Sequence, residues 1–202
     1  MTDAPPAYSD DRALVNAVLS GRSGAFERLV REHQTLCWHI VLKLVRDRGD
    51  AEDLCQETFL RVHRYLDQYR FDSALRTWIG RIAYSVALRH LERRRLPLAD
   101  EPAFVDDADG DGGYGEALDR IPGDDDPQAR SEQTQIDALL RRQMDRLPPI
   151  QSLLLTLYHL DELTIPEISA TTGLPSGTIK SHLFRARARL RDALATALGE
   201  AP

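Results

Sequence analysis

The sequence predicts an all-α protein with two small helical domains, residues 10–96 and 131–196, joined by a flexible acidic linker over residues 97–130. Aromatic residues make up only 6% of the chain, and Leu, Ala and Arg dominate, a composition that favours helix over sheet. The linker is rich in Asp, Gly and Pro and has few apolar groups to offset the entropy of ordering. A chain of 202 residues has room for one or two domains and is too short for a large barrel enzyme.

Four helices are expected in the first domain, because apolar residues recur there at i, i+3 and i+4. Turn residues and acidic first-turn residues mark their ends. The expected helices start at a cap on Ser9 or Asp10, run from Gly24 to Arg46, run from a cap on Asp50 to Leu66, and follow Ser73 to about Arg95.

The second domain shows the same periodicity on a smaller scale. Pro149 suits the first turn of a helix, and Gly173 suits a tight turn between two helices. The expected helices run from Ser131 to Leu147, from Pro149 past Tyr158, from Ile165 to about Thr171 behind a Thr164 cap, and from Pro175 or Ser176 to Leu194.

Charge is distributed unevenly along the chain. The formal net charge of −6 would argue against a nucleic-acid partner. Residues 97–132, however, hold 12 acidic and 2 basic residues, whereas residues 1–96 carry +3 and residues 133–202 carry +1. The acidity therefore belongs to the linker, and both flanking segments are mildly basic.

Several functional classes are not expected. The sequence has no phosphate-binding glycine loop, HExxH or GxSxG motif, and its six histidines are scattered, so we expect no catalytic residue, metal site or cofactor, and no enzyme. Cys37 and Cys55 have no metal-ligand spacing, which fits a reduced compartment. The sequence shows no signal peptide and no stretch long enough to insert in a membrane, so we expect a cytoplasmic protein.

The segment LTIPEISATTGLPSGTIKSHLFRARARL, residues 163–190, has the pattern of a helix-turn-helix. Its second helix carries five basic and no acidic residues between Ser176 and Arg191. The alternative is a solvated arginine-rich helix in an ordinary bundle. We expect base-edge and phosphate contacts from the side chains on its exposed face: Ser176, Thr178, Lys180, Ser181, Phe184, Arg185 and Arg187.

Two further surfaces stand out in the first domain. In DAEDLCQETFLRVHRYL, residues 50–66, a second helix face bears Asp53, Gln56, Glu57 and Leu60, and it is either a protein-docking surface or a solvated acidic face. In YRFDSALRTWIGRIAYSVALRHLERRR, residues 69–95, aromatic side chains precede a basic helix, which suits single-stranded nucleic acid. Tyr69 and Phe71 are the expected exposed contacts, whereas core packing explains Trp78 equally well.

Together these segments resemble the bacterial RNA polymerase sigma factors of the extracytoplasmic-function (ECF) group over residues 10–96 and 133–195. DAEDLCQETFLRVHR resembles the segment that docks on the β′ clamp helices of core RNA polymerase. DSALRTWIGRIA resembles the segment that opens and recognises the −10 promoter element, and the helix-turn-helix resembles the domain that recognises the −35 element. Family members often have glycine where Phe71 stands, phenylalanine where Leu75 stands and tryptophan where His63 stands.

The resemblance implies a role for each surface. Asp53, Gln56, Glu57 and Leu60 would bind core polymerase, and the helix-turn-helix residues above would contact −35 DNA. The linker would lie in the RNA-exit region of polymerase or serve as a spacer, and an anti-sigma factor would be a further partner. Contacts with −10 DNA would come from Tyr69, Phe71, Asp72, Ser73, Arg76, Trp78, Arg89, Arg93 and Arg94.

Two other functions remain open at this point. A sigma-like decoy would sequester an anti-sigma factor without supporting transcription, but it would not need a basic recognition helix. A regulator that binds a duplex operator as a dimer would not need the aromatic and basic segment of residues 69–95. A promoter-specificity factor accounts for all three surfaces.

Overall fold

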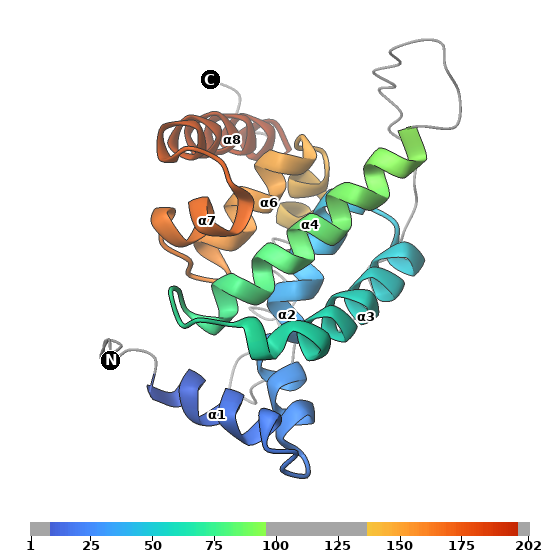
Figure 1. Cartoon of the computed structure of the whole chain (residues 1–202). Helices are drawn as coiled ribbons and strands as arrows, with labels where there is room; N and C mark the ends of the chain where they lie inside the picture. The colour runs from blue at the N-terminus through green and yellow to red at the C-terminus, as the bar shows by residue number, and fades with distance from the viewer. Residues whose placement is uncertain (1–8, 96–136, 198–202) are drawn as a thin grey trace, which may run out of the picture.

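The computed structural model of the chain describes residues 9–95 and 137–197, and within them every regular element is a helix (Figure 1). Residues 137–145 are helical and precede α6. The all-α prediction is confirmed, whereas the linker and the helix start expected at Ser131 lie outside the described residues. The other helices are α1 (Ser9–Leu19), α2 (Ala25–Val45), α3 (Arg48–Tyr65), the 3-10 helix η2 (Leu66–Gln68), α4 (Leu75–Arg95), α6 (Pro149–His159), α7 (Ile165–Thr172) and α8 (Ser176–Ala197).

Helix α2 is the central element of the first half and packs against α1, α3 and α4. It begins after Gly24, at φ 75°, and ends before Arg46, at φ 61°, so both of its predicted ends are confirmed. Its inner stripe is fully buried at Leu29, Ile40 and Val41. This stripe is the apolar face that the helical periodicity predicted.

The cap of helix α3 lies three residues before the expected one, so the prediction that Asp50 caps it is wrong. Asp47 is the cap, because its backbone is extended and its carboxylate accepts the amide hydrogen of Asp50 at 2.9 Å. Asp50 lies inside the first turn, and its own carboxylate lies 2.6 Å from Arg94 of α4. An acidic residue in either position is favourable, because both lie at the positive end of the helix dipole.

The second half follows its local signals closely. Pro149 occupies the first turn of α6. Thr164 caps α7 through a capping box in which the Thr164 hydroxyl accepts from the Glu167 amide and the Glu167 carboxylate accepts from the Thr164 amide. Gly173 ends α7 at φ 75°, a left-handed conformation that glycine adopts without a Cβ penalty. Helix α8 follows with Ile179, Leu183 and Ala186 buried.

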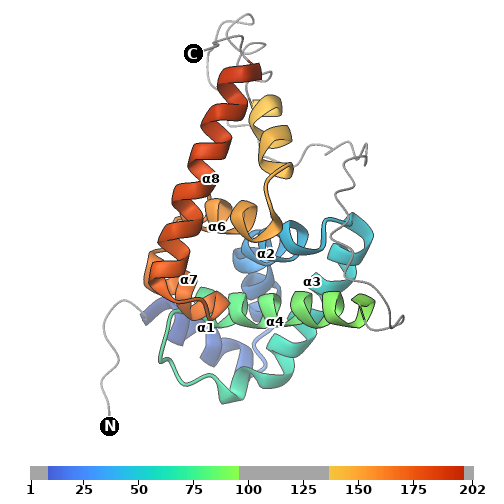
Figure 2. The same cartoon turned by 90° about the horizontal axis from the view of Figure 1, so that it is seen from above.

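The two halves pack against each other, α2 against α6 and α4 against α7 (Figures 1 and 2). Their buried apolar side chains form one continuous cluster. Helix α4 approaches α7 closely at Gly80, where an added Cβ would lie 3.1 Å from the Thr171 Cγ2 atom. A side chain at this position would hold the two helices apart.

Polar contacts surround this apolar junction. Lys43 forms an ion pair with Asp145 at 3.1 Å, and His39 Nδ1 lies 2.9 Å from Asp161 Oδ1. In addition, Arg81 donates to the Ala170 carbonyl at 3.1 Å. Within the described ranges, no helix combines the length and apolar character that crossing a bilayer requires.

Candidate nucleic-acid and protein interfaces

The face of α3 predicted to dock on a protein lies on the outside of the bundle. Asp53 and Gln56 are exposed, and Leu60 is 72% exposed. Glu57 is half-buried and pairs with Arg61 at 2.5 Å. An exposed leucine flanked by polar groups on one helix face offers an apolar anchor with a polar rim, the arrangement typical of a protein interface.

The loop between η2 and α4 differs from its prediction at Tyr69. This side chain was expected to be an exposed contact, but it is only 6% exposed, and its hydroxyl donates to the Ser73 carbonyl at 2.5 Å. Its ring lies 4.6 Å from that of Phe71 and 5.3 Å from that of Trp78. The three rings pack together because the loop folds back on α4, so Tyr69 supports the loop from inside.

Phe71 and Asp72 form the outer part of this loop. Phe71 is half-buried at φ 60°, a backbone conformation unusual for a bulky residue, and Asp72 is exposed. The left-handed backbone at Phe71 explains why the resembling family often has glycine there. The half-buried Ser73 contributes its carbonyl to the Tyr69 bond.

The basic residues predicted along α4 fall into two groups. Arg89 and Arg93 are exposed near the C-terminal end of the helix. Arg94 lies 2.6 Å from Asp50, and Arg76 lies 2.7 Å from Glu167 of α7. In this arrangement two of the four arginines predicted to contact −10 DNA, Arg76 and Arg94, form ion pairs within the protein.

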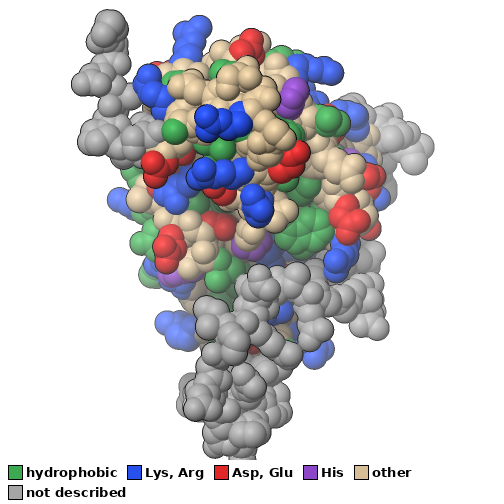
Figure 3. Space-filling view, turned by 90° about the horizontal axis from the view of Figure 1, so that it is seen from below, with side chains coloured by type: hydrophobic (Ala, Val, Ile, Leu, Met, Phe, Trp, Pro, Cys, Tyr) green, Lys and Arg blue, Asp and Glu red, His purple; other side chains and the backbone are tan. Residues whose placement is uncertain are grey.

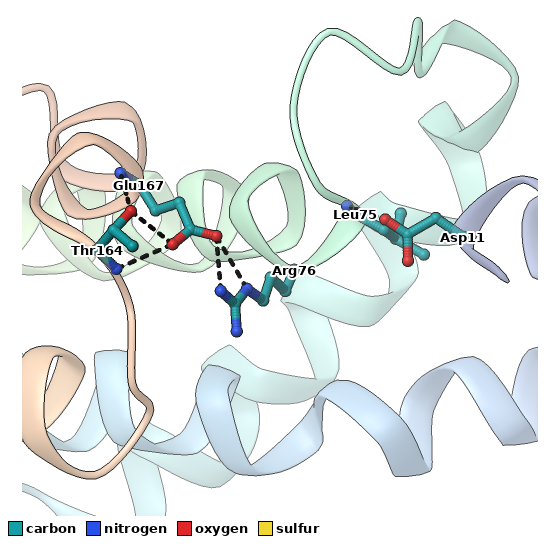
Figure 4. A network of polar contacts seen from close by, with 5 residues as sticks. All are labelled: Asp11, Leu75, Arg76, Thr164 and Glu167. Carbon is teal, nitrogen blue, oxygen red and sulfur yellow. Dashed lines mark hydrogen bonds and ion pairs between the residues drawn. The ribbon is translucent and has the colours of Figure 1, made fainter. Parts of the chain in front are cut away.

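Glu167 joins the two halves at the start of α7 (Figure 4). Its carboxylate accepts from the Thr164 amide at 2.9 Å and from Arg76 Nη2 at 2.7 Å. Burial raises the pKa of Glu167, but the hydrogen bonds from Thr164 and the Arg76 guanidinium outweigh it, so its pKa lies below the ordinary value. The carboxylate is therefore held ionised at the junction.

Most side chains predicted to contact DNA from α8 lie on one exposed face. Ser176, Lys180, Ser181 and Arg185 are exposed, and Phe184 is 75% exposed, whereas Thr178 is half-buried. The opposite side of the helix is buried at Ile179 and Leu183. An exposed phenylalanine between polar and basic groups can contact a thymine methyl in a major groove.

Arg187 is the exception on α8. Its guanidinium lies 5.3 Å from the Tyr158 ring centroid and donates to His159 Nε2 at 3.1 Å, so it is held against α6. Partial burial, and then the nearby Arg187 charge, lower the pKa of His159. No local pattern indicates this contact, because Arg187 has the same spacing along α8 as Arg185 and Arg189.

Two residues of α1 that the sequence pattern does not single out contact the loop before α4. The Asp11 carboxylate accepts from the Leu75 amide at 2.7 Å, and the Arg12 guanidinium lies 4.6 Å from the Phe71 ring centroid. No local pattern identifies either residue, because their partners lie about 60 positions away. On the face seen in Figure 3, basic and acidic side chains are interspersed, so charge does not outline a nucleic-acid site on that face.

Comparisons with known proteins match both halves of the chain. The family described as Sigma-70 region 2 matches residues 29–96, and Sigma-70, region 4 matches residues 137–190. These two regions, in this order on an all-α fold, define a transcription initiation factor of the sigma-70 class.

Relatives along almost the whole chain specify the group. The chain is 31% identical over 191 residues to the RNA polymerase sigma-H factor of Pseudomonas aeruginosa, covering 95% of this chain and 97% of that one. It is 36% identical over 179 residues to the ECF RNA polymerase sigma-E factor of Escherichia coli, covering 88% and 90%. The chain belongs to the ECF group of bacterial RNA polymerase sigma factors.

Solved structures share the fold. The sigma factor RpoE in complex with the anti-sigma factor NepR from Bartonella quintana has a TM-score of 0.59 at 21% identity, over 85% of this chain and 97% of that one. CnrH in complex with the cytosolic domain of CnrY has a TM-score of 0.58 at 22% identity, over 92% and 97%. At these identities the likeness supports the helical architecture alone.

Proposed function

We propose that this ECF sigma factor directs core RNA polymerase to specific promoters through three separate surfaces. The α3 face of Asp53, Gln56, Glu57 and Leu60 docks on the β′ clamp helices. The loop of residues 69–76 and the basic side of α4 melt and bind the −10 element, and the exposed face of α8 binds the −35 element. The observation that carries this proposal is the α8 face, where Lys180 and Phe184 project from a helix packed on its other side.

Promoter geometry requires the two halves to separate during function. The centres of the −10 and −35 elements lie about 25 base pairs apart, which is ~85 Å at a rise of ~3.4 Å per pair. In the packed arrangement α7 lies against α4, and α8 itself, with 22 residues, is only ~33 Å long. Residues 10–96 and 131–196 therefore act as two domains on polymerase. The 41 residues between the described ranges span up to ~140 Å when extended.

The packed arrangement suits an inhibited state. Arg76, proposed to contact −10 DNA, is occupied by Glu167 of the −35 domain. A cytoplasmic anti-sigma factor or domain that binds both halves would keep this pair intact and hold the DNA-binding elements too close together. The acidic residues 97–130 act in the RNA-exit region once the halves separate. The protein itself catalyses no reaction and needs no metal or cofactor.

Run-off transcription with purified core polymerase tests this function. We expect specific initiation on a matched −35/−10 promoter library only when the sigma factor is added. Failure on every promoter, with an anti-sigma factor still bound, would indicate a decoy. Tight binding to duplex DNA without polymerase would indicate an operator-binding regulator.

Separate variants test the division of labour. Lys180→Glu should abolish selection of the −35 element and leave core binding intact, and Arg191→Glu is its control because Arg191 pairs with Asp192 outside the proposed contact set. Asp53→Ala with Leu60→Ala should lower core affinity and leave the α8 face unchanged. Equal loss of core binding in both variants would refute the assignment of these surfaces.

A further inference from the structure

Helix α4 begins without a side-chain cap of its own. Its flanking residue is Ala74, whose carbonyl accepts from the amides of Thr77 at 3.0 Å and Trp78 at 3.1 Å. First-turn amides have no partner within a helix, and a Ser, Thr, Asp or Asn side chain at the flanking position usually accepts from one of them. The alanine side chain has no acceptor atom, so the first turn of α4 depends on a group from elsewhere.

Asp11 of α1 supplies that group from 64 positions away in the sequence. Its Oδ2 atom accepts from the Leu75 amide at 2.7 Å, in a partly buried contact (Figure 4). A carboxylate there also complements the positive end of the α4 dipole. Asp11 therefore fixes the point at which the preceding loop becomes helix.

Arg12, the next residue of α1, holds the other end of the same loop. Its guanidinium lies 4.6 Å from the Phe71 ring centroid, which is within cation–π range. Phe71 has φ 60°, a conformation that costs energy for any residue with a Cβ and persists only where neighbours stabilise it. Two neighbours of the Phe71 ring supply that stabilisation, the Arg12 guanidinium and the Tyr69 ring, whose centroid lies 4.6 Å from that of Phe71.

We propose that Asp11 and Arg12 are positioning residues for the −10 loop, residues 70–74. They fix its two ends so that the exposed Asp72 and the edge of Phe71 present one geometry to an unpaired base. This inference rests on the proposed role of the loop in −10 recognition. Helix α1 lies outside both segments matched by the sigma-70 families, residues 29–96 and 137–190.

The test combines two assays on the full-length chain, which give three readouts. Amide hydrogen exchange at Leu75 and residues 70–74 of the free protein reports the loop without polymerase. With core polymerase, the rate of open-complex formation is followed by fluorescence of 2-aminopurine in the −10 element. Discrimination against a promoter with one substituted −10 base is measured in the same assay.

Asp11→Ala removes the acceptor. We expect faster exchange at Leu75, roughly tenfold slower opening and weaker −10 discrimination, since a helix cap changes an equilibrium by about this factor. Asp11→Asn keeps an acceptor oxygen and should restore most of the exchange protection, the opening rate and the −10 discrimination. Asp10→Ala removes a neighbouring exposed carboxylate and should match the wild type, and core affinity should be unchanged in all three.

Arg12 is tested by a double-mutant cycle with Phe71. Arg12→Ala should slow opening in the wild-type background. In the Phe71→Gly background it should have no effect, because glycine adopts the left-handed conformation freely and carries no ring for Arg12 to hold. An equal effect of Arg12→Ala in both backgrounds would indicate a direct phosphate contact and overturn its positioning role.

The outcomes separate this inference from the proposed function. If wild-type protein fails to initiate on any promoter, the proposed function fails, whereas the exchange measurement still reports on the loop. If initiation is normal but Asp11→Ala leaves Leu75 exchange or −10 discrimination unchanged, the positioning role fails. If Asp11→Ala lowers core affinity and opening in the same proportion, Asp11 has only a general structural role, which also overturns the inference.

Discussion

Replacing Gly80 by alanine should shift the protein from the packed towards the separated arrangement. An added Cβ would meet Thr171 Cγ2 of the second half at 3.1 Å and Ile40 Cδ1 of the first half at 3.3 Å. Favourable contacts between carbon atoms lie at ~3.5–4.0 Å. The tighter clash is therefore the one between halves, and separation of α4 from α7 relieves it.

The substitution has two opposing energies, of which only the clash differs between the packed and the separated arrangement. Overpacking a close contact costs about 1–3 kcal/mol. Alanine inside a helix is favoured over glycine by roughly 0.5–1 kcal/mol, and α4 keeps this gain in both arrangements. The equilibrium between packed and separated forms should consequently shift by the clash alone, about 5- to 150-fold towards separation.

Small-angle X-ray scattering of the free chain measures this shift as an increase in the radius of gyration. Gly177→Ala is the matched control, because nothing lies within 4 Å of an added Cβ there and the residue is also helical. A higher unfolding midpoint for Gly80→Ala without any change in scattering would contradict this prediction. That result would mean that Thr171 moves aside at no cost.

Three further predictions follow from the contacts of the described residues. Charge reversal of Lys43→Glu should weaken packing by about 1 kcal/mol, and adding Asp145→Lys should restore it in urea unfolding, since the pair is only partly buried. Because the pKa of Glu167 is lowered in the folded protein, its ionised form should stabilise the fold above the ordinary carboxyl pKa of 4.5, and this stabilisation should be lost as pH falls through the lower folded pKa. Glu167→Gln should therefore reduce the dependence of the free energy of unfolding on pH in this range. The interaction between the Cys37 and Cys55 side chains, together with burial, raises the pKa of Cys37, and the same interaction lowers the pKa of the less buried Cys55. Iodoacetamide should therefore modify Cys55 first, as measured by mass spectrometry of digests.

The helices with strong local signals were predictable from the sequence. Thr164 and Glu167 form a capping box within four residues, and Gly173 ends α7 where a left-handed residue is needed. The ends of α2 at Gly24 and Arg46 depend on similarly short-range chemistry. These features need no knowledge of the rest of the fold.

The structure differs from the sequence prediction where several residues could cap the same helix or where a side chain's partner is distant in the sequence. Asp47 and Asp50 are both residues suited to cap α3, and in the structure Asp47 is the cap. The position of Tyr69 near a turn predicts an exposed side chain, because nothing local indicates that its ring packs on Trp78, nine residues later. The hydrogen bond from the Leu75 amide to Asp11 cannot be predicted locally, because the sequence near Leu75 shows only that Ala74 is a poor helix cap.

The pairing of Arg76 with Glu167 indicates how readily the packed arrangement can open. The two side chains are 41% and 24% exposed, and a pair of this kind contributes at most about 1 kcal/mol. A DNA phosphate offers Arg76 an equivalent acceptor, so exchange of the carboxylate for DNA costs little. The main resistance to opening must then come from the apolar contacts of α4 with α7 and α2 with α6. Salt, which screens ion pairs, should therefore open the protein much less than Gly80→Ala does, and strong opening by 0.5 M NaCl in the same scattering assay would contradict this ranking.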